Sequence, residues 1–311
     1  MAIITSARSG NWSDPATWTG GVVPVEGDNV VISSGHTVIL DDAAFSASGL
    51  VIVGNDSLTP AIRISENATL LIPSNSQLAT RILRLKGNME VKSNGTFQVG
   101  DSETSPVPPD RVVRVQLNYS ASLAAGKYGI ILRTPPTGPG KLRLYGTIKD
   151  SFAEIESVSG ATFKVSRLNG WRVGDRVCLA APSATDTTER IEELTIASID
   201  PDNRTITLSP TPQYSYQPSR VTVRDVTFVT YLVANVTRNV VIESYSPSHP
   251  SWIFADLYPA YSGNIDQIIA KGVQFAYIGN NAGNQVGVHV TGSSSARARA
   301  TCVGCSFYRG F

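Results

Sequence analysis

Short apolar runs in which every second residue is polar recur along the whole chain of 311 residues. Gly, Asn, Asp, Ser or Pro lies between nearly all of them, as around residues 82–85, 112–117 and 141–145. A period of two that is broken by turn residues is typical of β-strands with one buried face. No segment has the period of a convincing amphipathic helix. The sequence therefore predicts an all-β protein.

The low charge of the chain excludes several other classes of protein. Charged residues make up 16% of the sequence, against about 25% in ordinary globular proteins, and the formal net charge is +1. A coiled coil would need far more Glu and Lys, and a disordered chain would have less than the 41% apolar content found here. Counterion-driven binding to nucleic acid needs a basic excess, so no nucleic-acid partner is predicted.

Two internal alignments of the C-terminal part indicate stacked β coils. Residues 270–275 align with residues 302–307 at an offset of 32. Residues 240–243 align with residues 268–271 at an offset of 28. A coil of this length cannot bury its inward face alone, so it must stack on a neighbouring coil, as in a parallel β-helix.

Two stretches of the chain combine Trp with a Gly-Asp pair that leads into an apolar run. The first contains Trp18, Gly20, Pro24 and Gly27-Asp28, and the second, residues 170–180, contains Trp171 and Gly174-Asp175. In this order the two stretches resemble the motifs of the G8 domain family, over about residues 10–215. The resemblance implies a G8-like β domain at residues 1–215 that continues into a right-handed parallel β-helix (solenoid) at residues 216–311. The family includes animal cell-surface and secreted proteins, among them hyaluronan-degrading ones, and bacterial and phage proteins.

Four acidic residues are candidates for catalysis if the chain is an enzyme. Asp28 and Asp175 follow Gly at the entry to a strand, where a short carboxylate accepts hydrogen bonds from the turn, and we favour this structural role for both. Glu192 and Glu193 belong to an acidic cluster. Paired carboxylates cleave glycosidic bonds or bind Ca²⁺ through oxygen, and the alternative for this pair is a solvated loop.

The segment 245–261 is dense in aromatic residues and is broken by three prolines. We interpret it as a surface for stacking of sugar rings or for contact between subunits, because aromatic residues this dense seldom stay exposed without a partner. The alternative is a loop that packs on the flank of the β-helix. The candidate contact residues are Tyr245, His249, Trp252, Phe254, Tyr258 and Tyr261.

No metal site and no cofactor are predicted. The three histidines are scattered, and Cys302 and Cys305 have no second Cys/His pair at zinc spacing, so we interpret these two cysteines as buried fillers of a coil. No window has the roughly 18 apolar residues that would span a bilayer, and residues 1–8 lack the pattern of a signal peptide. Membrane insertion is therefore not expected.

We predict a structural and adhesive component of a phage-type particle, such as a tail, a fibre or another virion appendage. The protein would be a homo-oligomer, for example a trimer, or assemble with other particle proteins, and it would contact glycans in a virion or extracellular setting. The alternative is an extracellular polysaccharide-degrading enzyme, hyaluronidase-like by the resemblance. The few ionisable groups favour the non-enzymatic role, and Tyr145 stands where many members of the family have His.

Overall fold

The chain forms two compact units, Met1–Thr147 with Asn239–Phe311 and Ile148–Arg238, and each is described here by itself. The structure is a computed structural model. It describes residues 2–55, 60–117, 129–133, 138–179, 191–229, 231–248, 250–255, 263–279, 287–290 and 296–308.

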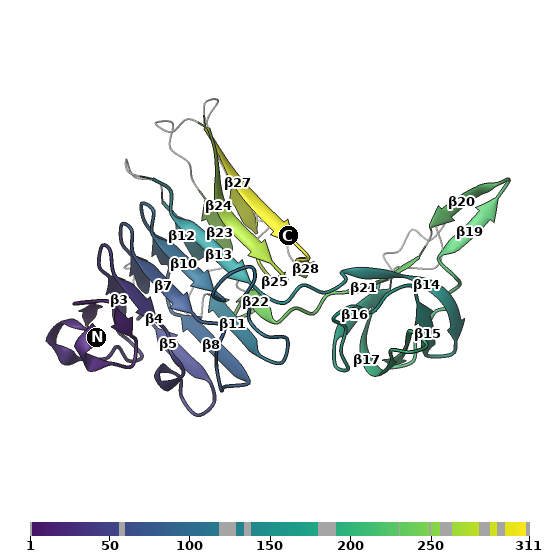
Figure 1. Cartoon of the computed structure of the whole chain (residues 1–311), viewed down its shortest axis with the longest axis horizontal. Helices are drawn as coiled ribbons and strands as arrows, with labels where there is room; N and C mark the ends of the chain where they lie inside the picture. Colours follow the sequence, from purple (N-terminus) through teal and green to yellow (C-terminus); the bar gives the residue numbers. More distant parts are fainter. Residues whose placement is uncertain are drawn as a thin grey trace. The chain divides into compact units, whose positions relative to one another are not determined.

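The first unit consists of three sheets in which all strand pairs are parallel (Figure 1). The first sheet contains β1 (Ile3–Thr5), β3 (Asn29–Ile32), β6 (Ile62–Ile64), β9 (Met89–Val91), β12 (Gly129–Leu132), β23 (Trp252–Ala255) and β26 (Val288–Val290). The second contains β2 (Gly10–Asn11), β4 (Thr37–Ile39), β7 (Thr69–Ile72), β10 (Thr96–Val99), β13 (Lys141–Tyr145), β24 (Gly263–Lys271) and β27 (Ala296–Val303). The third contains β5 (Leu50–Val53), β8 (Thr80–Leu85), β11 (Val112–Leu117), β22 (Val240–Ser244), β25 (Val273–Ala276) and β28 (Ser306–Tyr308). The chain visits the three sheets in rotation, so each strand lies beside the strand from the previous round.

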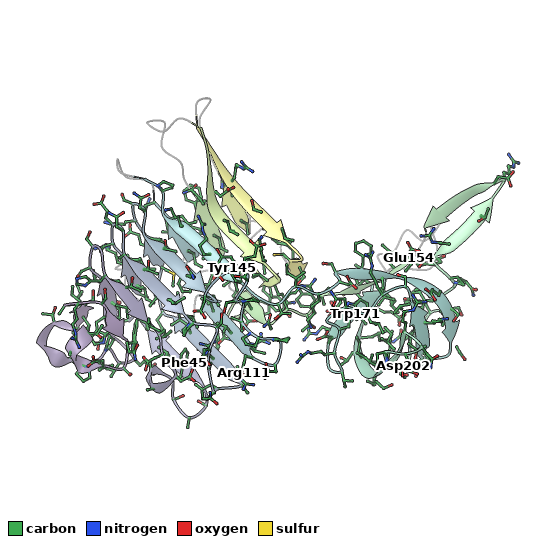
Figure 2. The ribbon with its side chains drawn as sticks, in the orientation of Figure 1. Phe45, Arg111, Tyr145, Glu154, Trp171 and Asp202 are labelled. Atoms are coloured by element: carbon green, nitrogen blue, oxygen red, sulfur yellow. The ribbon has the colours of Figure 1, made fainter. Side chains whose placement is uncertain are left out.

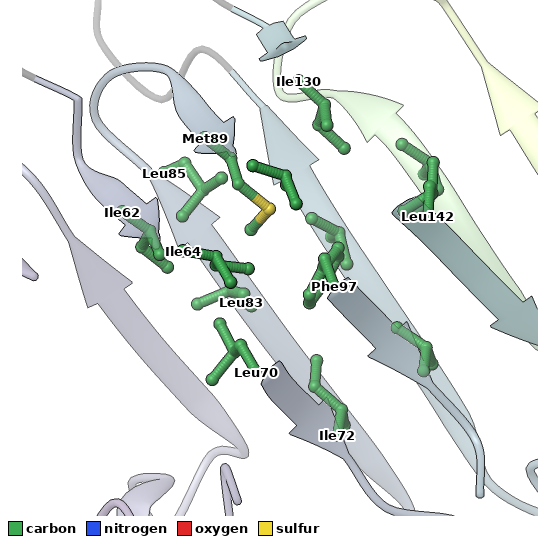
Figure 3. Close-up of a cluster of buried hydrophobic side chains, with 14 of the residues drawn as sticks. Ile62, Ile64, Leu70, Ile72, Leu83, Leu85, Met89, Phe97, Ile130 and Leu142 are labelled. Carbon is green, nitrogen blue, oxygen red and sulfur yellow. The ribbon is translucent and has the colours of Figure 1, made fainter. Parts of the chain in front are cut away.

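Alternate residues of these strands form the core between the sheets. In the third sheet, Val51, Leu83, Val115, Ile242 and Phe275 lie in one register column, and all are buried. Figure 3 shows how side chains from strands of the three sheets, such as Ile64, Leu70 and Leu83, point toward a common interior. Full burial of each such side chain contributes roughly 1.5–3 kcal/mol. The short alternating runs of the sequence therefore become continuous apolar columns.

Arg81 is an exception within this interior. It lies in register with Val113, and the same column continues to Val240 and Val273. Its side chain is fully buried, and its guanidinium nitrogens have no hydrogen-bond partner among the described residues. Burial lowers the pKa of Arg81 from its usual value, although the nearby charge of Asp42 opposes this shift. Arg81 therefore places a desolvated charge in a column whose other members, in the neighbouring strands, are Val.

The second unit is a closed antiparallel barrel. Its strand order is β14 (Phe152–Ser159), β15 (Thr162–Val165), β18 (Thr205–Ser209), β17 (Glu192–Asp200), β16 (Arg176–Leu179) and β21 (Leu232–Asn235). A core of its own contains Phe163, Trp171 and Ile206, and Trp171 is labelled in Figure 2. A hairpin of β19 (Arg220–Val223) and β20 (Val226–Val229) completes the unit. Closure leaves no free edge in the barrel.

The barrel is an insertion between two strands of the parallel sheets. The chain leaves the first unit after β13 and returns at β22, where the amide of Thr147 donates to Asn239 Oδ1 at 2.9 Å. The Asn239 amide group also donates to the carbonyls of Val107, at 2.9 Å, and Pro108, at 2.8 Å. The two ends of the insertion are thus fixed side by side within the first unit.

The all-β prediction and the parallel sheets are confirmed, but the structure divides the chain differently from the predicted boundary at residue 215. Parallel strands begin at β1, and the barrel is inserted in the chain between β13 and β22. A period of two does not distinguish parallel from antiparallel strands, which is why the two kinds of strand were predicted as one domain. No helix among the described residues is long and apolar enough to cross a membrane.

Of the two internal alignments, one is confirmed and the other is wrong. Residues 270 and 302 pair in the second sheet, and residues 275 and 307 pair in the third. Val240, however, pairs with Val273 in the third sheet, whereas Ile268 lies in the second sheet. Similar apolar runs occur in all three sheets, so the sequence pattern alone does not identify the partner strand.

Replacing Arg81 by Leu should raise the stability of the first unit, by roughly 1 kcal/mol or more, because a well-packed apolar side chain removes the cost of a buried charge. Hydrogen exchange of the β8 and β11 amides in the full chain measures the effect. Leu83→Ala in the same strand is the reference, with an expected loss of about 2–5 kcal/mol. A comparable loss for Arg81→Leu would contradict the prediction.

Candidate functional site

Asp28 in the first unit and Asp175 in the second unit close two turns of the same kind. Asp28 Oδ2 accepts from the amide of Val25 at 3.3 Å, and Asp175 Oδ2 accepts from the amide of Arg172 at 3.0 Å. The backbone amide of each Asp donates back to the carbonyl three residues earlier, at 3.1 Å and 3.0 Å. The preceding glycines have φ of 95° and 87°, a conformation that favours Gly. The Gly-Asp pattern of the sequence is thus a carboxylate-closed turn at a strand entry.

The remaining bonds of these two carboxylates are also structural. Asp28 Oδ1 accepts from the amide of Ala2 at 2.8 Å. Asp175 is bound at 2.7 Å by Lys149 Nζ and at 2.8 Å by Asn235 Nδ2. The Lys149 and Asp175 side chains are only 5% and 6% exposed. Burial lowers the pKa of Lys149, and its hydrogen bond to Asp175 opposes this shift. This arrangement supports the favoured structural role for both residues.

Glu192 and Glu193 do not form a facing pair of carboxylates. Glu192 is buried, and its two oxygens accept from the amide of Gln213 at 2.6 Å and the hydroxyl of Tyr216 at 2.7 Å. Burial and this bond to Glu192 raise the pKa of Tyr216 above its usual value. Glu193 is the next residue of β17, so its side chain leaves the strand on the opposite face. Both line a pocket of 310 Å³ beside Tyr214, but both Glu192 oxygens are already bonded to the segment 213–216.

Two of the predicted contact residues, Trp252 and Phe254, lie together on the outer face of the first sheet. Their ring centroids are 6.2 Å apart, edge to face, and Phe254 has the same relation to His289 of β26 at 5.3 Å. The intervening Ile253 is buried in the core. Gly129 lies opposite Trp252, and a Cβ there would be 2.0 Å from the Trp252 carbonyl oxygen, so only Gly fits. We call Trp252, Phe254 and His289 the aromatic strip.

The aromatic strip continues as a row of residues on the outer face of five strands, in which the central residue, Ile131, is buried at 8% exposure. Register pairs Arg63 with Glu90, Glu90 with Ile131, Ile131 with Phe254, and Phe254 with His289. Neighbouring strands are about 4.8 Å apart, so the row spans roughly 19 Å.

An ion-pair cluster forms the polar end of this row. Glu90 is bridged by Arg63 Nε at 2.9 Å and by Arg133 Nε at 3.3 Å. The row therefore combines ring faces and edges at one end with oriented charged donors and acceptors at the other.

Tyr245 lies elsewhere, next to the third sheet. It follows β22, and the guanidinium of Arg84 lies 5.3 Å from its ring centroid. The outer face of that sheet also carries an ion pair of Arg114 with Glu243 at 3.0 Å and a hydrogen bond of Gln116 to Glu243 at 2.8 Å. His249, Tyr258 and Tyr261 lie outside the described residues. The predicted aromatic set is thus divided between two faces, and His289, which the prediction omitted, joins the strip through strand register.

Cys302 is not buried as predicted, although its register with Ala270 is confirmed. Among the described strands, it lies on β27 at the edge of its sheet, paired with β24 alone. Cys305 is half-buried, and its thiol donates to the carbonyl of Ala270 at 3.3 Å. The hydrogen bond with Cys305 raises the pKa of Cys302. Within the described part of the chain, no three His, Cys, Asp or Glu side chains gather as metal ligands would.

Comparison with known proteins confirms the resemblance found in the N-terminal part. Residues 17–150 match the family model of the G8 domain. Over 237 residues, or 74% of this chain, the sequence is 26% identical to human Fibrocystin-L and 25% identical to mouse Fibrocystin-L. The chain spans only about 5% of the length of these curated relatives. No solved structure matches it significantly. The second Gly-Asp stretch, with Asp175, lies beyond the range that the family model matches.

Replacing Asp175 by Leu should destabilise the barrel by about 3–5 kcal/mol, because it leaves the Lys149 ammonium buried without its partner. The double variant Lys149→Met/Asp175→Leu should recover most of this loss, since neither charge of the ion pair is then left buried without its partner. Hydrogen exchange of the β16 and β17 amides measures both. Equal stability of the single variant and the unmodified chain would show that the ion pair is dispensable.

Proposed function

We propose that the G8 domain of this chain, residues 17–150, belongs to a right-handed parallel β-helix that serves as a structural and adhesive module and contacts glycans. Three parallel sheets visited in rotation support the β-helix, with each sheet as one of its faces. The right hand is the one that parallel strand connections almost always take. The barrel is then an insertion within one turn of the solenoid.

The observation that carries the glycan contact is the row on the outer face of the first sheet. A sugar ring has an apolar C–H face and a rim of hydroxyl groups. Trp252 and Phe254 offer rigid aromatic surface for the apolar face, and the Arg63–Glu90–Arg133 cluster offers charged donors and acceptors to hydroxyl groups. Because the row crosses five strands, it suits an extended saccharide chain better than a single sugar.

The setting of the module stays a prediction from the sequence. We propose a phage-type particle, with a homo-oligomer or other particle proteins as the assembly and a virion or extracellular location. The relatives reported above are mammalian Fibrocystin-L proteins, and this chain corresponds to only about 5% of their length. The role of those whole proteins is therefore not transferred to this chain.

A polysaccharide-degrading enzyme is the alternative proposal. Three of the four candidate acids, Asp28, Asp175 and Glu192, already have both carboxylate oxygens bound by nearby donors. Cleavage by a pair of carboxylates needs two such groups that flank the bond. These bonds favour the binding module over the enzyme.

Phe254→Ala should lower the affinity for a bound polysaccharide by about tenfold, which corresponds to about 1.4 kcal/mol, because the central ring of the strip is lost. The measurement is a binding titration of the full chain against hyaluronan and a panel of bacterial capsular polysaccharides. Tyr245→Ala, which truncates an aromatic ring next to the third sheet, is the matched control and should bind normally. Equal affinity for both variants and the unmodified chain would refute the strip as the contact, and shortening of the polysaccharide would favour the enzyme.

A further inference from the structure

The third sheet has one strand fewer than the other two sheets, and the difference lies at the N-terminal end of the first unit. Among the described residues, the first and second sheets each have seven strands and the third has six. The first round of the chain contributes β1 and β2, then makes the 3-10 turns η1 (Pro15–Thr17) and η2 (Thr19–Gly21) in place of a third strand. As a result β5 is the edge of the third sheet, paired only with β8 (Figure 1).

The backbone of β5 has one unused donor and acceptor on its free edge. The backbone N–H and C=O of Val53 point toward β8, where the carbonyl accepts from the amide of Lys86 at 2.8 Å. The N–H and C=O groups of Leu50, Ile52 and Gly54 therefore point away from β8, toward the free edge. Both backbone groups of Leu50 are already bonded, because its carbonyl accepts from the amide of Ser46 at 3.1 Å and its amide donates to Ser46 Oγ at 3.2 Å. The amide of Gly54 donates to the Asp28 carbonyl at 2.8 Å. The N–H and C=O of Ile52, between them, have no partner among the described residues.

A pocket of 520 Å³ lies directly beside this edge. Residues 50–52 form one wall, and residues 12–13, 23–26 and 43–46 form the others. Phe45, labelled in Figure 2, is buried at 8% exposure, and Val25 is 64% exposed. Glu26, the one charged residue among the described lining residues, is already paired with Lys86 at 2.8 Å. The pocket is therefore electrically neutral and largely apolar.

We propose that this pocket binds an extended, uncharged segment of a partner polypeptide, which adds as a short strand to the free edge of β5. A peptide backbone presents an acceptor and a donor together, as the free C=O and N–H of Ile52 require, and alternate side chains reach into the pocket. One apolar side chain of the segment extends the interior column beyond Val51. The bonds already made at Leu50 and Gly54 keep the added strand short. Because the lining carries no unpaired charge, a charged segment would lose hydration without compensation.

The test uses the full chain and a labelled probe peptide, acetyl-Thr-Val-Thr-Phe-Thr-Val-Thr-amide. Among the backbone hydrogen-bonding groups of β5, Ile52→Pro removes only the unused N–H, since the bonds to β8 come from the neighbouring residues. Ile52→Thr is the matched control because it keeps the backbone donor. We expect saturable one-to-one binding to the unmodified chain and to Ile52→Thr. A loss of at least about tenfold in affinity is expected for Ile52→Pro and for Ala44→Phe, which fills the pocket.

Two further measurements keep the test decisive. If Ile52→Pro does not fold, the chemical shift of the Ile52 amide on addition of the peptide decides, and a shift centred on β5 supports the site. A peptide with Lys in place of Phe should bind at least about tenfold more weakly. No binding to the unmodified chain, or equal binding to all variants, overturns the proposal. A concentration-dependent dimer that Ala44→Phe abolishes also overturns it, because the occupant is then a second copy.

Discussion

Parallel, in-register pairing is the constraint on which the first unit depends. Each strand lies on the strand from the previous round, so a residue in one round fixes the position of its counterparts in all others. Inward residues then form columns such as Val51 to Phe275, and outward residues form rows such as Arg63 to His289. The core and the candidate site are thus the two faces of one register. Arg81 shows the force of this constraint, because its place in a column buries it whatever its chemistry.

The sequence predicts the elements well and their connections poorly. Alternation identifies strands such as β11 and β13, because a half-buried strand must alternate. The match of residues 270 and 302 is also correct, because inward positions repeat from round to round. The barrel is not predicted, since closure of an antiparallel sheet leaves the same period of two. The register of Val240 with Val273, rather than with Ile268, depends on which sheet a strand joins, and no local residue specifies that.

The candidate site was predictable only in part for the same reason. Trp252 and Phe254 stand close together in the sequence, so their aromatic density is visible there. Glu90, Ile131 and His289 come from distant segments and meet them through strand pairing alone. The Gly-Asp turns illustrate the opposite case. The turn bonds of Asp28 and Asp175 each lie within four residues of chain, so local turn chemistry indicates this structural role before any fold is known.

The bond between Thr147 and Asn239 has a consequence for how this chain tolerates change. The two ends of the barrel insertion are held together by this bond. For the parallel strands, the 91 residues 148–238 are therefore one long loop whose ends lie side by side. The entropy of closing a loop grows only slowly with its length. Pairing of β11 with β22 across this gap therefore costs only roughly 3 kcal/mol more in chain entropy than pairing across a turn of a few residues. The junction is a place where a whole domain can be gained, lost or exchanged while the interior columns stay unchanged, which makes it a point of modular growth.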